Sequence, residues 1–140
     1  MNRDAILNYL VGEWHCKTIH TDQLGTHETS YNEVMTKKDD KTLTIKALGI
    51  RDGNDVTKNI TFKEHGDSID MIQGDFVATG EATENALYLV GRIKDTEYVF
   101  RLYFLKHVYL YQMDVVEDGK IVSTNVSHLT RLNKEDERDD

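Results

Sequence analysis

The chain has 140 residues, of which 39% are hydrophobic, with no proline, a single cysteine and a formal net charge of −8. This length suits one domain with a sizeable core. The acidic balance leaves no basic stripe to neutralise phosphates, which excludes duplex nucleic acid and anionic membrane surfaces as partners. One cysteine excludes an internal disulfide and a multi-cysteine metal site. The sequence has no glycine-rich phosphate-binding loop, so no cofactor is predicted.

The two ends of the chain set its expected organisation. The first residues lack the apolar core of a signal peptide, and no run of about 18 apolar residues could insert into a bilayer. We therefore expect a reduced, cytoplasmic protein, either a monomer or a homodimer. Seven of the eight residues 133–140 are charged, which predicts a disordered acidic tail after a single domain over residues 1–132.

A short helical pattern opens the chain. Apolar residues recur at helical spacing between Asp4 and Val11. Asp4 is the expected N-cap and Gly12 the expected stop. A helix of this size could plug one end of a barrel.

The rest of the chain predicts ten short strands rich in Val, Ile, Thr, Tyr and Phe. Gly, Asn and Asp mark the breaks between them, as tight hairpins require. The breaks recur about every 10–12 residues, which leaves no room for a crossover helix and predicts an antiparallel meander. The expected strands are 13–21, 27–36, 41–50, 55–63, 67–73, 75–82, 86–94, 97–106, 108–117 and 120–132.

The strand expected over 97–106 has no plainly polar face. Its alternate residues are Tyr98, Phe100, Leu102 and Phe104 on one side, and Val99, Arg101, Tyr103 and Leu105 on the other. An open sheet or sandwich would show a cleaner polar alternation. The pattern favours an all-β fold: a single antiparallel up-and-down β-barrel of eight to ten strands, with a cavity inside.

Residues at the two ends of the strand series carry a family resemblance. Gly12-Glu13-Trp14 begins the first strand, Trp14 is the only tryptophan, and Arg131 ends the last strand. This arrangement resembles the calycin superfamily, and with the preceding helix it looks like the small bacterial lipocalin-like proteins. The resemblance implies a lipocalin-like barrel in which Arg131 packs over Trp14 beside Gly12 and closes one end.

The resemblance also implies that the barrel binds a small hydrophobic or amphipathic ligand. An internal arginine would need an anionic partner, and neighbouring phenols could share its hydrogen bonds. We therefore expect an anionic or hydrogen-bonding head group, although alternation leaves open which strand face lines the cavity. The candidate ligand-binding residues are Arg101, Tyr103, Tyr111 and Gln112, followed by Tyr88 and Arg92.

Two alternatives remain open at this point. Some calycin barrels catalyse isomerisation or decarboxylation with Tyr, Arg and Glu from separate strands, although no nucleophile–base spacing in this chain favours an enzyme. A haem-binding barrel is the other alternative, with His128 as the least unsuitable ligand. The six histidines form no helical metal-binding pair, so no metal site is predicted. Cys16 alternates with Trp14 and is expected to be a buried, inert thiol.

Overall fold

A short helix precedes the strands in the computed structural model, which describes residues 1–132; the predicted tail over 133–140 lies outside the described residues. The helix α1 spans Arg3–Leu10, and the Asn2 side chain caps it by accepting a hydrogen bond from the Ala5 N–H at 2.8 Å. The prediction of Asp4 as the N-cap is therefore wrong. Asp4 lies in the first turn, where its charge suits the positive end of the helix dipole. Within residues 1–132, no helix is long and apolar enough to cross a membrane.

Ten strands follow α1, as the turn spacing predicts. Their bounds lie within a few residues of the expected ranges. The strands are β1 (Gly12–Asp22), β2 (Gly25–Lys37), β3 (Thr42–Arg51), β4 (Asn54–His65), β5 (Ser68–Gln73), β6 (Phe76–Ala82), β7 (Ala86–Ile93), β8 (Thr96–Phe104), β9 (Val108–Glu117) and β10 (Lys120–Arg131).

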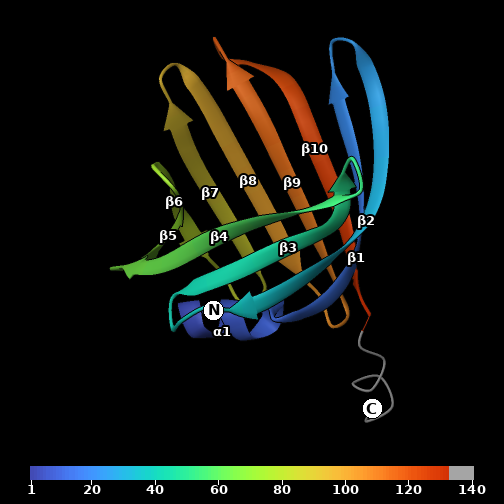
Figure 1. Ribbon diagram of the computed structural model, residues 1–140. Helices are drawn as coiled ribbons and strands as arrows, with labels where there is room; N and C mark the ends of the chain where they lie inside the picture. The colour runs from blue at the N-terminus through green and yellow to red at the C-terminus, as the bar shows by residue number, and fades with distance from the viewer. Residues whose placement is uncertain (133–140) are drawn as a thin grey trace.

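The strands form one closed antiparallel barrel, which confirms the predicted fold class. Each strand pairs with its neighbours along the chain, and β1 also pairs with β10, so each of the ten strands within residues 1–132 has a partner on both sides. Trp14 lies opposite Arg131 in that last pairing. Figure 1 shows the strands in chain order around the barrel, with α1 across one end.

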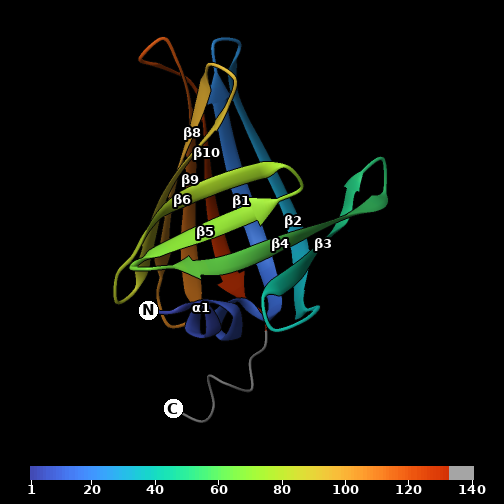
Figure 2. The same cartoon turned by 90° about the vertical axis from the view of Figure 1, so that its left-hand side faces the viewer.

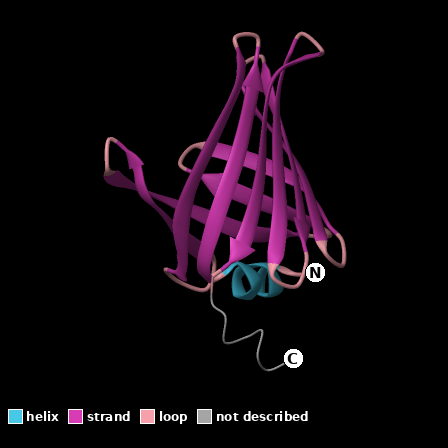
Figure 3. Ribbon diagram, turned by 90° about the vertical axis from the view of Figure 1, so that its right-hand side faces the viewer, coloured by secondary structure: helices cyan, strands magenta, loops and turns pink. Residues whose placement is uncertain are grey.

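The helix closes this end by burying its apolar face. Ile6, Leu7 and Leu10 are at most 4% exposed and belong to the same buried cluster as Trp14. Figure 3 shows α1 lying against the end of the strands, at the opposite end from the β1–β2 turn. The barrel therefore has a filled floor at α1, and any free internal space lies beyond it.

The β3–β4 hairpin departs from the barrel wall. The two strands pair regularly as far as Ala47 opposite Val56, and the register shifts before Arg51 pairs with Asn54. In Figures 2 and 3 the end of this hairpin projects away from the other strands. The end of the hairpin therefore lies outside the barrel wall, while the rest of β3 and β4 remains paired within it.

Candidate ligand cavity

Arg131 joins the last strand to the end of α1. Its guanidinium carbon lies 4.1 Å from the centroid of the Trp14 ring and 5.3 Å from that of Tyr9. The guanidinium also donates hydrogen bonds to the backbone oxygens of Tyr9 (2.7 Å) and Val11 (3.1 Å). The last turn of α1 contains no basic residue, so this distant cation pairs with its free carbonyl groups.

Trp14 and Gly12 complete this closed end. The Trp14 indole is fully buried and donates to the Leu10 backbone oxygen at 2.9 Å. Gly12 has φ 141°, and a Cβ there would lie 2.9 Å from Arg131 Nη1. The three residues that sequence reasoning assigned to barrel closure therefore meet in one place.

Above this floor the barrel encloses a cavity of about 560 Å³. The volume lies within the range of about 300–1,000 Å³ that is typical of small-molecule sites. Its wall is mainly apolar and aromatic, and includes Met35, Ile60, Phe62, Phe100 and Leu102. A smaller hollow of about 290 Å³ adjoins the cavity and continues toward the β3–β4 hairpin. The cavity and the hollow share four lining residues, which are Tyr31, Glu33, Ile45 and Lys58.

The cavity contains only one of the six predicted ligand-binding residues, Tyr111. On β8 the inward side chains are those of Phe100 and Leu102, so the intervening Arg101 points outward. Cross-strand register then places the partners of Arg101 on the outer face as well. The cavity lining therefore does not include Arg101, Tyr103, Gln112, Tyr88 or Arg92.

Arg101 has a different set of partners on the outside of the barrel. Its Nη1 lies 3.1 Å from the Asp114 carboxylate, and its guanidinium lies 5.5 Å from the centre of the Tyr88 ring. Gln112 and Thr124 also donate to Asp114, which is only 5% exposed. The acidic partner that a shielded arginine requires is therefore supplied by the protein, and the predicted anionic head group loses its basis.

The remaining outer-face candidates lie away from the cavity too. Tyr88 and Tyr103 are 49% and 46% exposed. Arg92 forms an ion pair with Glu97 at 3.0 Å, and both side chains are partly open to solvent. Surface pairs of this kind contribute little to stability.

The acid of the cavity is Glu33, which sequence reasoning did not select. Glu33 lies on β2 between Trp14 of β1 and Ala47 of β3, and it is 8% exposed. Burial raises its pKa, and the more distant positive charge of Lys58 offsets part of this rise. The alternation of Tyr31, Glu33 and Met35 on one strand was the available signal, since these three side chains share a face.

Tyr109 and Tyr111 line the same cavity as this carboxyl group. Burial raises the pKa of Tyr111 to about 12, and the negative charge of Glu33 adds to the rise. Burial, and after it the negative charge of Glu33, also raises the pKa of Tyr109 well above its ordinary value. Both phenols therefore stay protonated at neutral pH. The Tyr109 O–H donates to the Met35 sulfur at 3.9 Å, which leaves the Tyr111 O–H to hydrogen-bond a ligand.

A polar strip continues from Glu33 along β1 and β10. The Cys16 sulfur lies 3.3 Å from Thr18 Oγ1, which lies 2.7 Å from Ser127 Oγ. Cys16 is 2% exposed, and burial raises its pKa, so it is a protonated thiol at neutral pH. The cavity thus has hydrogen-bonding groups along β1, β2 and β10, and the rest of its lining is mainly apolar and aromatic.

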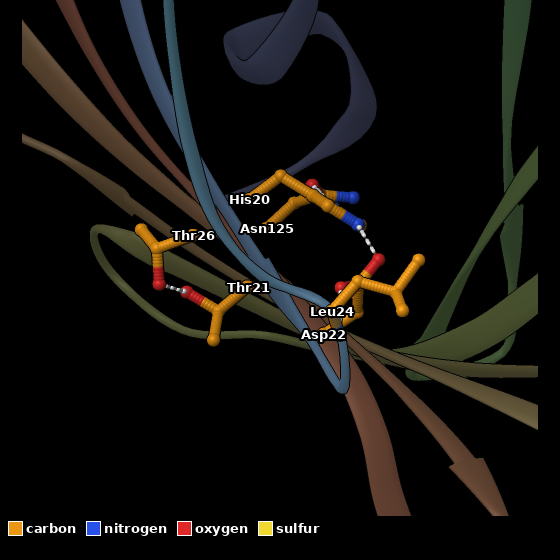
Figure 4. Close-up of polar contacts among 6 residues, drawn as sticks. All are labelled: His20, Thr21, Asp22, Leu24, Thr26 and Asn125. Carbon is orange, nitrogen blue, oxygen red and sulfur yellow. Dashed lines mark hydrogen bonds and ion pairs between the residues drawn. The ribbon is translucent and has the colours of Figure 1, made fainter.

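A second polar group lies near the β1–β2 turn, far from α1. His20 Nδ1 lies 2.6 Å from Asn125 Oδ1, and His20 Nε2 lies 3.1 Å from Asp22 Oδ2 (Figure 4). The hydrogen bonds to Asn125 and Asp22 raise the pKa of His20. Asp22 also accepts from the Leu24 N–H, which holds this turn. His20 is not among the lining residues of the cavity.

The haem and enzyme alternatives each require particular side chains to face the cavity. His128 is exposed on the outer face of β10, next to the inward Leu129, so it does not point into the cavity as the haem alternative requires. In the described part of the chain, no three His, Cys, Asp or Glu side chains form a metal-binding group. The enzyme alternative called for Tyr, Arg and Glu together, and within residues 1–132 no arginine lines the 560 Å³ cavity.

Several solved structures share this barrel. An S-type phycobiliprotein lyase from Guillardia theta superposes with a TM-score of 0.71 at 10% identity, over 94% of this chain and 93% of its own. A DUF3598-family protein of unknown function from Nostoc punctiforme gives 0.66 at 13% identity, over 90% and 48%. A Mycobacterium tuberculosis protein gives 0.60 at 12% identity, over 95% and 99%.

These similarities concern the fold. No protein-family model matches the chain, and no curated protein matches it in sequence. The structural neighbours share the β-barrel fold with this chain, and the site itself has to indicate the function.

Proposed function

We propose that this protein binds a small hydrophobic or amphipathic molecule inside its barrel. The observation that carries the proposal is the 560 Å³ cavity, lined by apolar and aromatic side chains with a few hydrogen-bonding groups on one wall. That combination is typical of small-molecule sites, because the apolar wall supplies affinity and the polar groups supply orientation. The structural similarity to a phycobiliprotein lyase supports a barrel that handles a small molecule.

The test is a titration with the neutral fluorescent probe N-phenyl-1-naphthylamine. Met113 lines the cavity, whereas Leu110 on the same strand lies on the outer face opposite Tyr103. Met113→Trp should fill part of the cavity and strongly weaken probe binding, while Leu110→Trp adds the same bulk outside and should leave binding unchanged. Excitation beyond the tryptophan absorption band keeps the added indoles from contributing to the signal.

Two results would contradict the proposal. The wild-type protein could show no saturable probe binding, which would indicate a filled barrel. Alternatively, both variants could bind the probe with wild-type affinity, which would place the probe on the surface. Thermal unfolding of each variant checks that any loss of binding does not come from loss of the fold.

A further inference from the structure

The cavity buries a carboxyl group without a partner. Glu33 is 8% exposed and lines both the main cavity and the adjoining hollow. Among residues 1–132 its carboxyl group has neither a hydrogen bond nor an ion pair. Its oxygens are not fully enclosed by protein atoms, so they reach the free space of the cavity, where a ligand can bind them. Asp114, another buried acid, differs in accepting hydrogen bonds from Arg101 and Thr124.

The neighbours of Glu33 in the sheet do not supply that partner. Trp14 lies opposite it on β1, with its indole N–H already donated to Leu10, and Ala47 lies opposite it on β3. The one Lys or Arg in the lining of the main cavity, within the described chain, is Lys58 on β4. Lys58 is exposed, as is Arg51 in the lining of the adjoining hollow, and the charge of Lys58 acts on Glu33 without forming an ion pair within the described chain. The cavity therefore keeps an unmatched acceptor on its wall.

Aromatic rings lie on the same inner surface. Tyr31, Tyr109 and Tyr111 line the cavity near Glu33, and Phe76, Tyr98 and Phe100 line the rest of its aromatic wall. The faces of such rings attract cations, most strongly where water is excluded. A carboxylate on the wall of an aromatic-lined cavity is complementary to a positively charged nitrogen, and it would repel the carboxylate of a fatty acid.

We propose that the cavity selects an organic cation, a molecule with a compact apolar body and one protonated nitrogen that binds the Glu33 carboxylate. This proposal rests on the binding function proposed above and names its ligand class. The cation would supply the hydrogen bonds that Glu33 lacks, and the apolar body would fill the space between β4, β5 and β8. Tyr111 could donate a further hydrogen bond to a polar substituent.

The experiment compares three ligands that share a ten-carbon chain and differ in their head groups. Decylammonium, decanol and decanoate each displace bound N-phenyl-1-naphthylamine from the wild-type protein and from three variants. Glu33→Gln removes the charge with little change in shape. Glu81→Gln removes an exposed charge from the outer face of β6, and it controls for the general attraction of an acidic protein for cations. Lys58→Gln removes the positive charge of the same wall.

We expect the wild-type protein to prefer decylammonium over decanol and to bind decanoate most weakly. Glu33→Gln should weaken decylammonium binding at least about tenfold, the factor that corresponds to a lost hydrogen bond between charged groups. Decanol and the neutral probe should bind this variant almost as before. Glu81→Gln should behave like the wild type, and Lys58→Gln should bind decylammonium at least as tightly.

The outcomes separate the two proposals. If the probe and decanol bind but Glu33→Gln leaves the preference for decylammonium unchanged, the cation site is wrong and the binding function stands. Tighter binding of decanoate than of decylammonium to the wild type would also overturn the cation site. If none of the compounds binds, the binding function itself fails, and the cation site fails with it.

Discussion

Arg131 is the residue whose removal should disturb the barrel most directly. It stacks on Trp14 at 4.1 Å and donates to the backbone oxygens of Tyr9 and Val11. The stacking is worth about 1 kcal/mol, and two hydrogen bonds from a charged donor contribute about 1 kcal/mol each after exchange with water. Arg131→Ala should therefore lower the free energy of unfolding by about 3 kcal/mol.

This loss can be converted to a melting temperature. An unfolding entropy of about 2.1 cal/mol/K per residue gives about 0.27 kcal/mol/K for a barrel of this size, so Tm should fall by about 10 °C. Trp14 is fully buried and is the only tryptophan, so its emission reports on the closed end as heat or urea unfolds the protein. Amide exchange in α1 should accelerate as well, because the helix loses the cation at its carbonyl end.

Two further variants sharpen the test. Arg131→Lys keeps the charge but cannot lie flat on the indole while it donates to both carbonyl groups, so its midpoint should fall between those of the wild type and the alanine variant. Arg51→Ala removes an exposed arginine at the end of β3 and should change stability by no more than about 0.5 kcal/mol. An Arg131→Ala midpoint that equals that of Arg51→Ala would refute the role of Arg131 in closing the barrel.

Three other predictions concern separate parts of the molecule. Glu33→Met should raise the unfolding free energy at neutral pH by about 1 kcal/mol, because it removes a partly desolvated acid from the cavity wall. Burial raises the pKa of Glu33, so wild-type stability should fall as pH rises through that raised pKa. Urea unfolding at several pH values measures both effects, and an equally stable variant with an unchanged pH profile would contradict them. Gly80→Ala should destabilise the barrel severely, since a Cβ there would clash with the Tyr88 backbone oxygen. A variant that melts at the wild-type temperature would contradict this close approach. The hydrogen bond to Asn125 raises the pKa of His20, so Asn125→Ala should lower that pKa. The stabilisation by His20 is complete at low pH and is lost as pH rises through its folded pKa. An NMR titration of the His20 ring that is unchanged in the variant would disprove the link.

The periodicity and turn chemistry of the sequence were sufficient to predict the architecture. Strand-forming runs separated by Gly, Asn and Asp about every 10–12 residues leave an antiparallel meander as the simplest fold, because short connections join neighbours only. The Trp14 and Arg131 positions predicted that the first and last strands would be adjacent, and these two residues lie opposite each other in the β1–β10 register. Both signals are local in the chain or tied to its two ends.

The tertiary structure decided which face of each strand is inside. Alternation places Arg101 and Tyr103 on one face and Phe100 and Leu102 on the other, but a shift of one residue exchanges the two sets. Only the closure of all ten strands fixes that choice, and it turned Arg101 outward to Asp114. The same closure brought Glu33 from β2 into a space that β4, β8 and β9 complete. Its character as a buried acid depends on atoms distant in the sequence, since desolvation is a property of the assembled wall.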